Sequence, residues 1–379
     1  MRAQPQQPIY LDYNSTTAID EAVLSKMNEV AKYPLNSSAI HSYGRKANAI
    51  IAEATSHIQQ LLNAFNYEII YTASATEATN TIFNGGDFKD ILISKIEHAS
   101  VFNCRPPHTK IHEIDCDENG QVNCVDLNKK LPSHPHFLVS VMACNNETGT
   151  LQPINEIAKI THQNLGLFHC DIVQAVGKIA IDLEDINVDC ASISAHKING
   201  PQGVGALIIR KGIDFKPLIL GGKQQKSKRA GSLNIAGIAG FGEACRLAQQ
   251  RLSAFSKIAD LRNYLEQNLY QIAGENIRFF SNNTPRLANT CFYSLRNISN
   301  QTQLINFDLN NICVSAGASC SSGTVSQSRI LKAMRIEHEF LDGAIRVSLS
   351  PQTTLDDINY FIKIFSEFYQ RTITKNIKL

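Results

Sequence analysis

The chain has 379 residues, of which 43% are hydrophobic and 18% charged, and its net charge is +2 from 36 basic and 34 acidic residues. This length and composition predict a globular protein with a buried core, built as one large domain or as a large domain with a smaller one. Because the charge is balanced, we expect no direct nucleic-acid partner and no membrane partner.

No apolar run in the sequence approaches the length that crosses a bilayer, and the N-terminal residues lack the hydrophobic segment of a secretory signal. The ten cysteines include no CxxC pair, which argues against a disulfide framework and against a tetrathiolate zinc site. We therefore expect a cytoplasmic protein without a bound metal, whose cysteines are mostly buried and reduced.

The first two hundred residues alternate between apolar runs and helical patterns. After the short strand-like start IYLDYNSTT, apolar residues recur at helical spacing from Arg45 to Ala64. Further helices are predicted at ASATEATNTIF, Glu97–Asn103, Val125–Leu131 and Ile154–Gln163. Strands are predicted at EIIYT, DILIS, KIHEI, FLVSVM, LFHC, CASIS and GALIIR. This alternation predicts an α/β fold with a mostly parallel sheet covered by helices on both faces.

The pattern changes after Arg210. The sequence GGKQQKSKRAGS is Gly-rich and basic, which is typical of an exposed or ligand-touching loop. A long helical stretch is then predicted from about Asn234 to Ala273, followed by a smaller α+β unit. Its strands are predicted near Asn289–Ser294, Ile312–Ser315 and Ile345–Ser348. We place the large domain at residues 12–255 and the small domain at residues 1–11 and 256–379.

Two predicted strands end in groups suited to chemistry. Asp171 ends the run LFHCD, and His196 and Lys197 follow CASIS. Ligands of open α/β sheets bind at the carboxyl ends of the strands, so we expect these groups in one crevice. A lysine and a carboxylate there suit pyridoxal phosphate, because lysine holds its aldehyde as a Schiff base and an acid keeps its ring nitrogen protonated. An ordinary ion pair between Asp171 and Lys197 would explain the same spacing equally well.

Five other positions each have a functional and a structural interpretation. Thr76 opens a predicted helix, where it either helps to bind an anion or acts as an N-cap. His98 could stack on an aromatic ring or transfer protons, or lie on a helix surface, and Asn146 could simply be a turn residue. Cys320, among Gly, Ala and Ser, is either a nucleophile or inert. Arg346, amid apolar neighbours, either clamps a carboxylate or forms a structural ion pair.

Ten segments in order resemble the cysteine desulfurases, pyridoxal-phosphate enzymes of fold type I in the class V aminotransferase group. The segments are YLDYNSTT, NSSAIHSYGR, ASATEATN, IEHASV, VSVMACNNETGTLQPI, HCDIVQAVGK, SISAHKINGPQGVGAL, RAGSLN, SAGASCSSGT and IRVSLS. They span nearly the full length of the chain. No P-loop, dinucleotide fingerprint, HExxH or GxSxG motif is present in the sequence.

The resemblance implies a role for each matching residue. Lys197 would hold the cofactor and move the substrate's α-proton, Asp171 would pair with the ring nitrogen, and His98 would stack on the ring. Cys320 would attack the sulfur of L-cysteine to give a persulfide and alanine. The phosphate would be held by Ala75, Thr76, Ser194 and His196, with Ser232 reaching it from a neighbouring protomer of a homodimer. The remaining contacts would be Asn146 and Gln174 near the phenolic oxygen, and Arg346 with Asn36 at the substrate carboxylate.

The sequence departs from the usual family pattern in several places, among them residues 35–39, Ser74, Thr79, residues 221–227 and Ser232, which keeps a hydroxyl where Thr is usual. None of these departures removes a catalytic group, so they suggest a divergent member. The family role would be to pass sulfur to an acceptor or iron–sulfur scaffold protein for cluster or thionucleoside synthesis. A selenocysteine lyase and a degenerate paralogue serving as a binding subunit are the alternatives.

Overall fold

The computed structural model describes residues 7–317 and 327–376. Its helices are α1 (Glu21–Ala31), α2 (Ser42–Leu62), α3 (Ala75–Gly85), α4 (Ala99–Phe102), α5 (Cys124–Lys130), α6 (Ile154–Gln163), α7 (Leu183–Ile186), α8 (Ile235–Ser256), α9 (Ile258–Ala273), α10 (Asn300–Asp308), α11 (Arg329–Ala333) and α12 (Leu355–Asn376). Its strands are β1 (Ile9–Tyr10), β2 (Tyr67–Thr72), β3 (Asp90–Ser94), β4 (Lys110–Ile114), β5 (Leu138–Ser140), β6 (Leu167–Asp171), β7 (Cys190–Ser194), β8 (Gly205–Arg210), β9 (Ile277–Phe279), β10 (Thr290–Leu295), β11 (Ile312–Cys313), β12 (Ser315–Ala316) and β13 (Ala344–Ser348).

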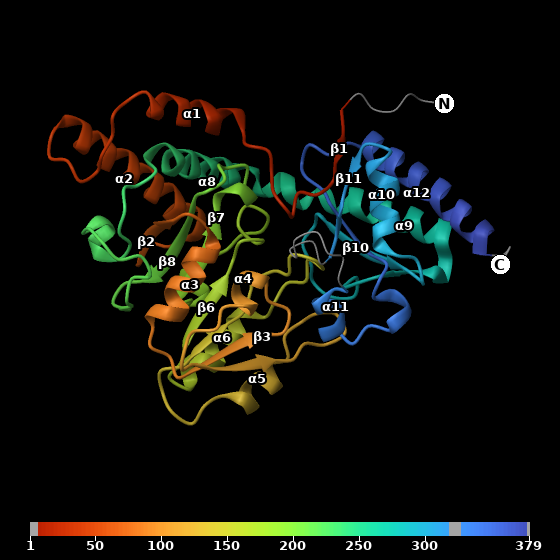
Figure 1. The fold of residues 1–379 in the computed structure, drawn as a ribbon, viewed down its shortest axis with the longest axis horizontal. Helices are drawn as coiled ribbons and strands as arrows, with labels where there is room; N and C mark the ends of the chain where they lie inside the picture. The colour runs from red at the N-terminus through yellow and green to blue at the C-terminus, as the bar shows by residue number, and fades with distance from the viewer. Residues whose placement is uncertain (1–6, 318–326, 377–379) are drawn as a thin grey trace.

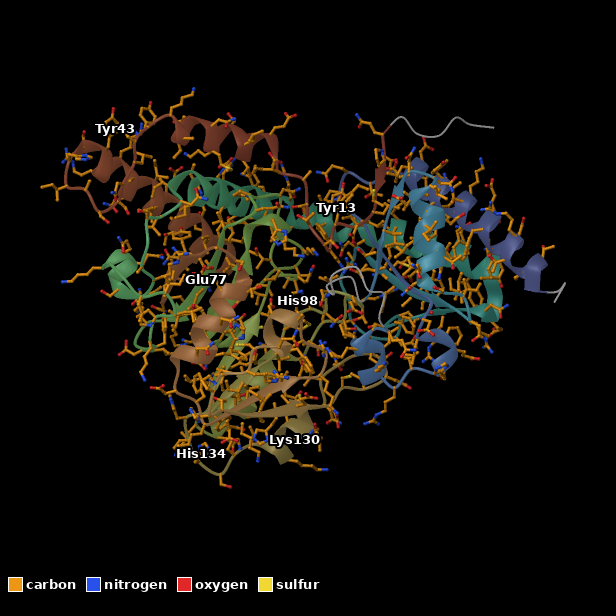
Figure 2. All side chains as sticks on the ribbon, viewed as in Figure 1. Tyr13, Tyr43, Glu77, His98, Lys130 and His134 are labelled. Carbon is orange, nitrogen blue, oxygen red and sulfur yellow. The ribbon has the colours of Figure 1, made fainter. Side chains whose placement is uncertain are left out.

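The large sheet has seven strands in the order β2-β8-β7-β6-β5-β3-β4. The pairs from β4 through β7 are parallel, and β8 runs antiparallel to both β7 and β2. This confirms the predicted α/β fold with a mostly parallel sheet. All strands except β8 therefore end at the same edge of the sheet. Figure 2 shows His98, which follows β3, at that edge, whereas His134, which contacts Asp90 at the start of β3, lies at the opposite end.

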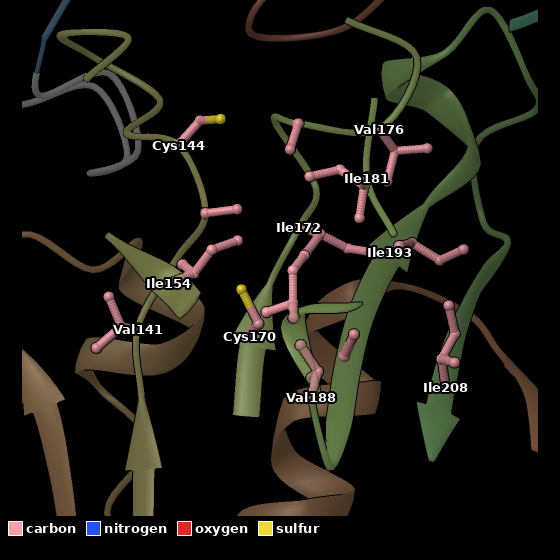
Figure 3. Close-up of a cluster of buried hydrophobic side chains, with 14 of the residues drawn as sticks. Val141, Cys144, Ile154, Cys170, Ile172, Val176, Ile181, Val188, Ile193 and Ile208 are labelled. Atoms are coloured by element: carbon pink, nitrogen blue, oxygen red, sulfur yellow. The ribbon is translucent and has the colours of Figure 1, made fainter. Parts of the chain in front are cut away.

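Helices bury both faces of the large sheet, and successive strand residues divide between the two faces. Ile91 and Ile93 of β3 pack in a cluster that includes Phe83 of α3. Leu92 between them belongs to the larger core cluster on the other face, together with Ile58 of α2. Figure 3 shows part of that larger cluster, where Cys170, Ile193 and Ile208 project from neighbouring strands. Burial on two faces is why these strands appear in the sequence as nearly continuous apolar runs.

The second sheet has four antiparallel strands in the order β12-β13-β10-β9 and a separate core cluster to which α9 and α12 contribute. The predicted smaller α+β unit is thus confirmed, and Figure 1 shows it as a lobe beside the large sheet. The predicted division of the chain at residue 255 stays a prediction. In the described part of the chain, no helix is long and apolar enough to span a membrane.

Two predicted elements are divided in the structure. The helix expected over 234–273 breaks at Lys257 into α8 and α9. No Gly or Pro interrupts the sequence there, so its pattern shows no break. The strand expected at Ile312–Ser315 splits into β11, which pairs with β1, and β12, which pairs with β13. Helices α1 and α12 were not among the predicted elements.

Candidate active site

A cavity of about 400 Å³ lies at the carboxyl ends of the large-sheet strands and reaches the small sheet. Residues singled out from the sequence line it together: Ala75, Thr76, His98, Asn146, Asp171, Gln174, Ser194, His196, Lys197 and Arg346. The sheet topology explains this gathering. Asp171 ends β6, Ser194 ends β7, and His98 and Asn146 lie shortly after β3 and β5, so all four reach one edge.

The amine of Lys197 is hydrogen-bonded to backbone carbonyl groups of the N-terminal segment. Its Nζ donates hydrogen bonds to the carbonyl oxygens of Asn14 at 2.6 Å and Ser15 at 2.7 Å. The Asp171 carboxylate instead accepts a bond of 3.0 Å from the Val173 N–H. Lys197 and Asp171 therefore have different hydrogen-bond partners and do not bond only to each other. Two separate contacts with one ligand require such an arrangement.

Asp171 is only 6% exposed. Burial raises the pKa of its carboxyl to about 6, although the Val173 N–H and the charge of Lys197 act in the opposite direction. A poorly solvated carboxylate gains more from a cationic partner than an exposed one does, because burial has removed the competing water. Asp171 is therefore suited to hold a protonated ring nitrogen.

The start of α3 forms an anion-binding wall of the cavity. Ser74 is the N-cap of α3, and its side chain accepts a bond of 3.2 Å from the Glu77 N–H, so the interpretation of Thr76 as the N-cap is wrong. Within residues 7–317 and 327–376, the N–H groups of Ala75 and Thr76 have no hydrogen-bond partner. Unpaired N–H groups at a helix start favour an anion such as phosphate.

Gly205 allows this wall to lie close to the sheet. It pairs with Ser194 of β7, and a Cβ atom at Gly205 would lie 2.8 Å from the carbonyl carbon of Ser74 and 3.0 Å from the nitrogen of Ala75. Any other residue would push the start of α3 away from Ser194. The side chain of His196 is fixed by a contact of 3.0 Å between its Nδ1 and the Thr16 hydroxyl.

His98 is the N-cap of α4, where its side chain accepts a bond from the Ser100 N–H. It lines the cavity and is not on a helix surface, so the alternative interpretation is wrong. Burial, and then the charges of Lys197 and two arginines, lower the pKa of His98 to about 4. The imidazole is therefore neutral near pH 7, which suits stacking on an aromatic ring.

Arg346 forms the structural ion pair that was one of its two interpretations, and its role as a carboxylate clamp stays a prediction. Its guanidinium forms an ion pair with Asp12 at 2.7 Å, and it donates further bonds to Ser15 Oγ at 2.7 Å and to the Asn146 carbonyl at 2.9 Å. Its Nε is buried without a partner among the described residues, as is Oδ1 of Asn146. These unsatisfied polar atoms belong to residues that line the cavity, and a polar ligand there could pair with them.

Two predicted site residues do not reach the cavity in a single chain. Asn36 and Ser232 are exposed and do not line it. Cys320 lies outside the described residues. The loop containing residues 221–227 is largely exposed, as predicted, but Gln225 from this loop bonds to the backbone of Tyr71 on the edge strand β2 through both amide atoms, at 2.7 and 2.8 Å.

Sequence reasoning missed several residues that support the site. Asn14 holds Lys197 through its carbonyl group, and Lys178 bonds to Asn14 and Gln174. His169 joins Ser140 and Ser192 through contacts of 2.8 Å at both ring nitrogens. The only signal in the sequence was that all of these residues fall within or beside the motifs YLDYNSTT, VSVMACNNETGTLQPI, HCDIVQAVGK and SISAHKINGPQGVGAL.

The residues present fit pyridoxal phosphate. One cavity has a lysine amine, a buried carboxylate, a neutral imidazole and unpaired N–H groups at the start of a helix, as the four parts of that cofactor require. Among the described residues, no group of three or more His, Cys, Asp or Glu side chains is placed to hold a metal ion.

Comparisons with known proteins agree with this chemistry. The family model for class V aminotransferases matches residues 9–361. The chain is 35% identical to cysteine desulfurase IscS of Dictyoglomus turgidum, covering 97% of this chain and 96% of the relative. It is 36% identical to a cysteine desulfurase of Enterobacter agglomerans, with 97% and 94% covered. The solved structure of a NifS-like protein from Rickettsia africae superposes with a TM-score of 0.88 at 38% identity, covering 96% of this chain and 100% of that one.

Proposed function

Because the chain belongs to the class V aminotransferases and, within them, to the cysteine desulfurases, we propose that it converts L-cysteine to L-alanine with pyridoxal phosphate and transfers the sulfur onward. The observation that carries this proposal is the joint placement of Lys197, Asp171 and the start of α3 in one cavity. An unrelated binding protein would have no reason to place an amine, a buried carboxylate and an anion site around one space.

Bound pyridoxal phosphate supplies an aldehyde that takes up amines and a ring that absorbs the charge left by α-proton loss. Lys197 would hold that aldehyde and move the proton. Asp171 would keep a proton on the ring nitrogen, and His98 would cover one face of the ring. Arg346 would orient the substrate carboxylate with its guanidinium.

Eight other residues complete the proposal. Asn146 and Gln174 would contact the phenolic oxygen region. The phosphate would be held by Ala75, Thr76, Ser194 and His196. Ser232 would join them from the second subunit of a homodimer, which its exposure in one chain supports. Asn36 would assist Arg346.

Cys320 would accept the sulfur, a role that rests on the motif SAGASCSSGT. Its thiolate would form a bond to the substrate sulfur while the carbon–sulfur bond breaks, and a proton would then replace sulfur on the carbon to give alanine. The persulfide would pass its outer sulfur to an acceptor or iron–sulfur scaffold protein. A cytoplasmic location is part of the proposal, and the nine described cysteines, all free thiols, support a reducing compartment.

The deciding experiment incubates the purified full chain with pyridoxal phosphate and measures alanine and sulfide from L-cysteine under reducing conditions. We expect equal amounts of both products, and neither product from Lys197→Ala. L-Selenocysteine is tested in parallel. A strong preference for it, with Cys320→Ala still active, would favour a selenocysteine lyase. Protein that stays colourless with the cofactor would favour a binding subunit.

A further inference from the structure

Lys178 is a buried lysine directly behind the candidate site. Lys178 is only 6% exposed and lies in the turn that follows β6. Its Nζ donates hydrogen bonds to Asn14 Oδ1 at 2.7 Å and to Gln174 Oε1 at 2.6 Å. Both of its hydrogen-bond partners are neutral amides. No carboxylate among the described residues forms an ion pair with it.

A closed ring of hydrogen bonds joins Lys178, Asn14 and Gln174. Lys178 bonds to the side-chain oxygens of the other two residues, and Gln174 Nε2 donates to the Asn14 carbonyl oxygen at 2.8 Å. That carbonyl oxygen also accepts the bond of 2.6 Å from Lys197 Nζ. The ring therefore includes the Asn14 carbonyl oxygen, which accepts a hydrogen bond from the Lys197 amine. It also contains the amide of Gln174, a residue that lines the cavity.

The small sheet fixes the same asparagine from the other side. Asn14 Oδ1 accepts a bond of 3.1 Å from Asn289 Nδ2, and Asn14 Nδ2 donates to Thr290 Oγ1 at 2.9 Å. Asn14 is 1% exposed, so water does not compete for these bonds. From the large-sheet side, Lys178 bonds to the side-chain oxygen of this asparagine and Gln174 bonds to its carbonyl oxygen.

A lysine without an anionic partner is unfavourable at a buried position. Burial lowers the pKa of Lys178 well below its usual range, and the positive charge of Lys197 lowers it further, while Cys144 acts in the other direction. A methionine of similar length would avoid this cost of burying an amine. The two hydrogen bonds to Asn14 and Gln174 therefore explain why an amine is present here, and they need only two N–H donors.

We propose that Lys178 is a positioning residue for Lys197, which it aims by fixing Asn14 and Gln174 in this ring. The inference rests on the proposed role of Lys197 as the residue that holds the cofactor. Lys178 itself touches neither substrate nor cofactor. The position of Lys197 matters because displacing a reacting amine by about 1 Å lowers the reaction rate on the order of a hundredfold.

The test uses Lys178→Met in the full chain, with Lys130→Met as the matched control. Lys130 donates to the backbone carbonyl of Glu113 and pairs with Asp126, and it does not line the cavity. For each protein, the rate of pyridoxal-phosphate capture by cofactor-free protein and the visible circular dichroism of the bound cofactor are measured. Steady-state kcat and KM for L-cysteine and the thermal unfolding midpoint of the cofactor-free protein are measured alongside.

We expect Lys178→Met to capture the cofactor at least about tenfold more slowly and to show a smaller dichroism signal. Its kcat should fall while its KM for L-cysteine stays within about twofold, because Arg346 is untouched. Lys130→Met should match the wild type in capture, dichroism and kcat. Capture and dichroism of Lys178→Met at wild-type values would overturn the inference.

A double-mutant cycle separates positioning from general loosening of the fold. If the ring transmits the effect, Asn14→Ala combined with Lys178→Met slows capture no more than the worse single variant does. Additive effects of the two substitutions would contradict the ring. A second variant, Lys178→Gln, keeps an N–H donor group on a shorter side chain that also carries a carbonyl oxygen, so its capture rate should lie between those of Lys178→Met and the wild type. A wild-type rate would again oppose the inference.

These outcomes are independent of the proposed function. Wild-type protein that captures no cofactor and forms no alanine would refute the proposed function itself. Wild-type protein that does both, beside an unimpaired Lys178→Met variant, would refute only the positioning role.

Discussion

Arg346 of β13 and Asp12 of the N-terminal segment form an ion pair at 2.7 Å, although 334 residues separate them in the sequence. Asp12 also accepts a bond of 2.7 Å from the Ser315 hydroxyl of β12. The Asp12 carboxylate thus contacts side chains from two strands of the small sheet, β13 and β12. It holds Arg346, the candidate substrate-binding arginine, in place. The position of Arg346 is fixed before any substrate arrives.

We predict that Arg346→Lys raises KM for L-cysteine at least about tenfold, because a lysine cannot reproduce the planar set of donors that bonds Asp12, Ser15 and Asn146. Removing donors from buried acceptors should also lower the free energy of unfolding by about 1–3 kcal/mol. Steady-state kinetics and urea unfolding measure the two effects.

The matched control for this variant is Arg296→Lys. Arg296 pairs with Glu339 at 3.2 Å, but both side chains are more than a third exposed. Surface pairs of this kind contribute little to stability, so we expect no measurable change in KM or unfolding. An unchanged KM in Arg346→Lys would remove Arg346 from the substrate site.

Asp171→Asn should have opposite effects on activity and on the stability of the cofactor-free protein. The amide cannot hold a proton on a ring nitrogen, so we expect activity to fall on the order of 10²–10⁴-fold. Stability at neutral pH should rise, because the pKa of Asp171 is raised by burial to about 6 and its buried ionised form is unfavourable.

The direction of the pH effect follows from the raised pKa. Asp171 contributes stability below its unfolded pKa near 4, and this contribution is lost as pH rises through about 6. The stability difference between Asp171→Asn and the wild type should therefore grow by about 2–3 kcal/mol from pH 4 to pH 7 and then level off. Urea unfolding of both cofactor-free proteins at several pH values tests this, and a difference that shrinks with pH would contradict it.

The sequence was sufficient to predict where most of the cavity residues meet, because strand ends follow directly from apolar runs. Asp171 and Lys197 are each placed by the strand that precedes them. The roles of Asn14 and Lys178 could not be predicted in this way. Their contact joins residues 164 positions apart, and neither residue type indicates a partner until the N-terminal segment is placed between the two sheets.

Other limits of the sequence also have physical causes. Ser74 and Thr76 are both good N-cap residues, and only the backbone shows that the helix starts at Ala75. The break between α8 and α9 lacks any Gly or Pro signal. Ser232 and Asn36 are exposed in the single chain, and their predicted roles stay predictions.

We predict that His169 contributes to stability through a buried chain of polar side chains. Its ring joins Ser140 to Ser192, and Ser192 in turn contacts the Thr79 hydroxyl of α3 at 3.2 Å. Burial lowers the pKa of His169 to about 3, so the ring is neutral and bridges as donor and acceptor. His169→Phe should remove the side-chain partner of Ser140 and one of the two partners of Ser192, and lower the free energy of unfolding by about 2–4 kcal/mol.

The control for that variant is His136→Phe, because His136 is exposed and lies at the other end of the large sheet. Thermal and urea unfolding should show no comparable loss there. A stable His169→Phe protein would mean that the serines find other partners or water.

Borohydride reduction of the protein with bound cofactor should attach the label to Lys197 alone. Lys178 is the competing amine, since it is near the site and its lowered pKa favours the neutral form that reacts with an aldehyde. Its two hydrogen bonds to Asn14 and Gln174 occupy it, so we expect no label there. Peptide mapping decides between them, and a label on Lys178 would overturn both its positioning role and the assignment of Lys197.

Cys144 and Cys320 should respond in opposite ways to substitution. Cys144 lines the cavity, but it is 1% exposed and burial raises the pKa of its thiol to about 12, so it is not a thiolate near pH 7. Cys144→Ala should therefore keep sulfide release within about threefold of the wild type, with a loss of stability of about 1 kcal/mol from the smaller side chain. Cys320→Ser should still bind L-cysteine, seen as a change in cofactor absorbance, yet release no sulfide. Sulfide release that survives Cys320→Ser and disappears in Cys144→Ala would transfer the nucleophilic role to the cysteine inside the cavity.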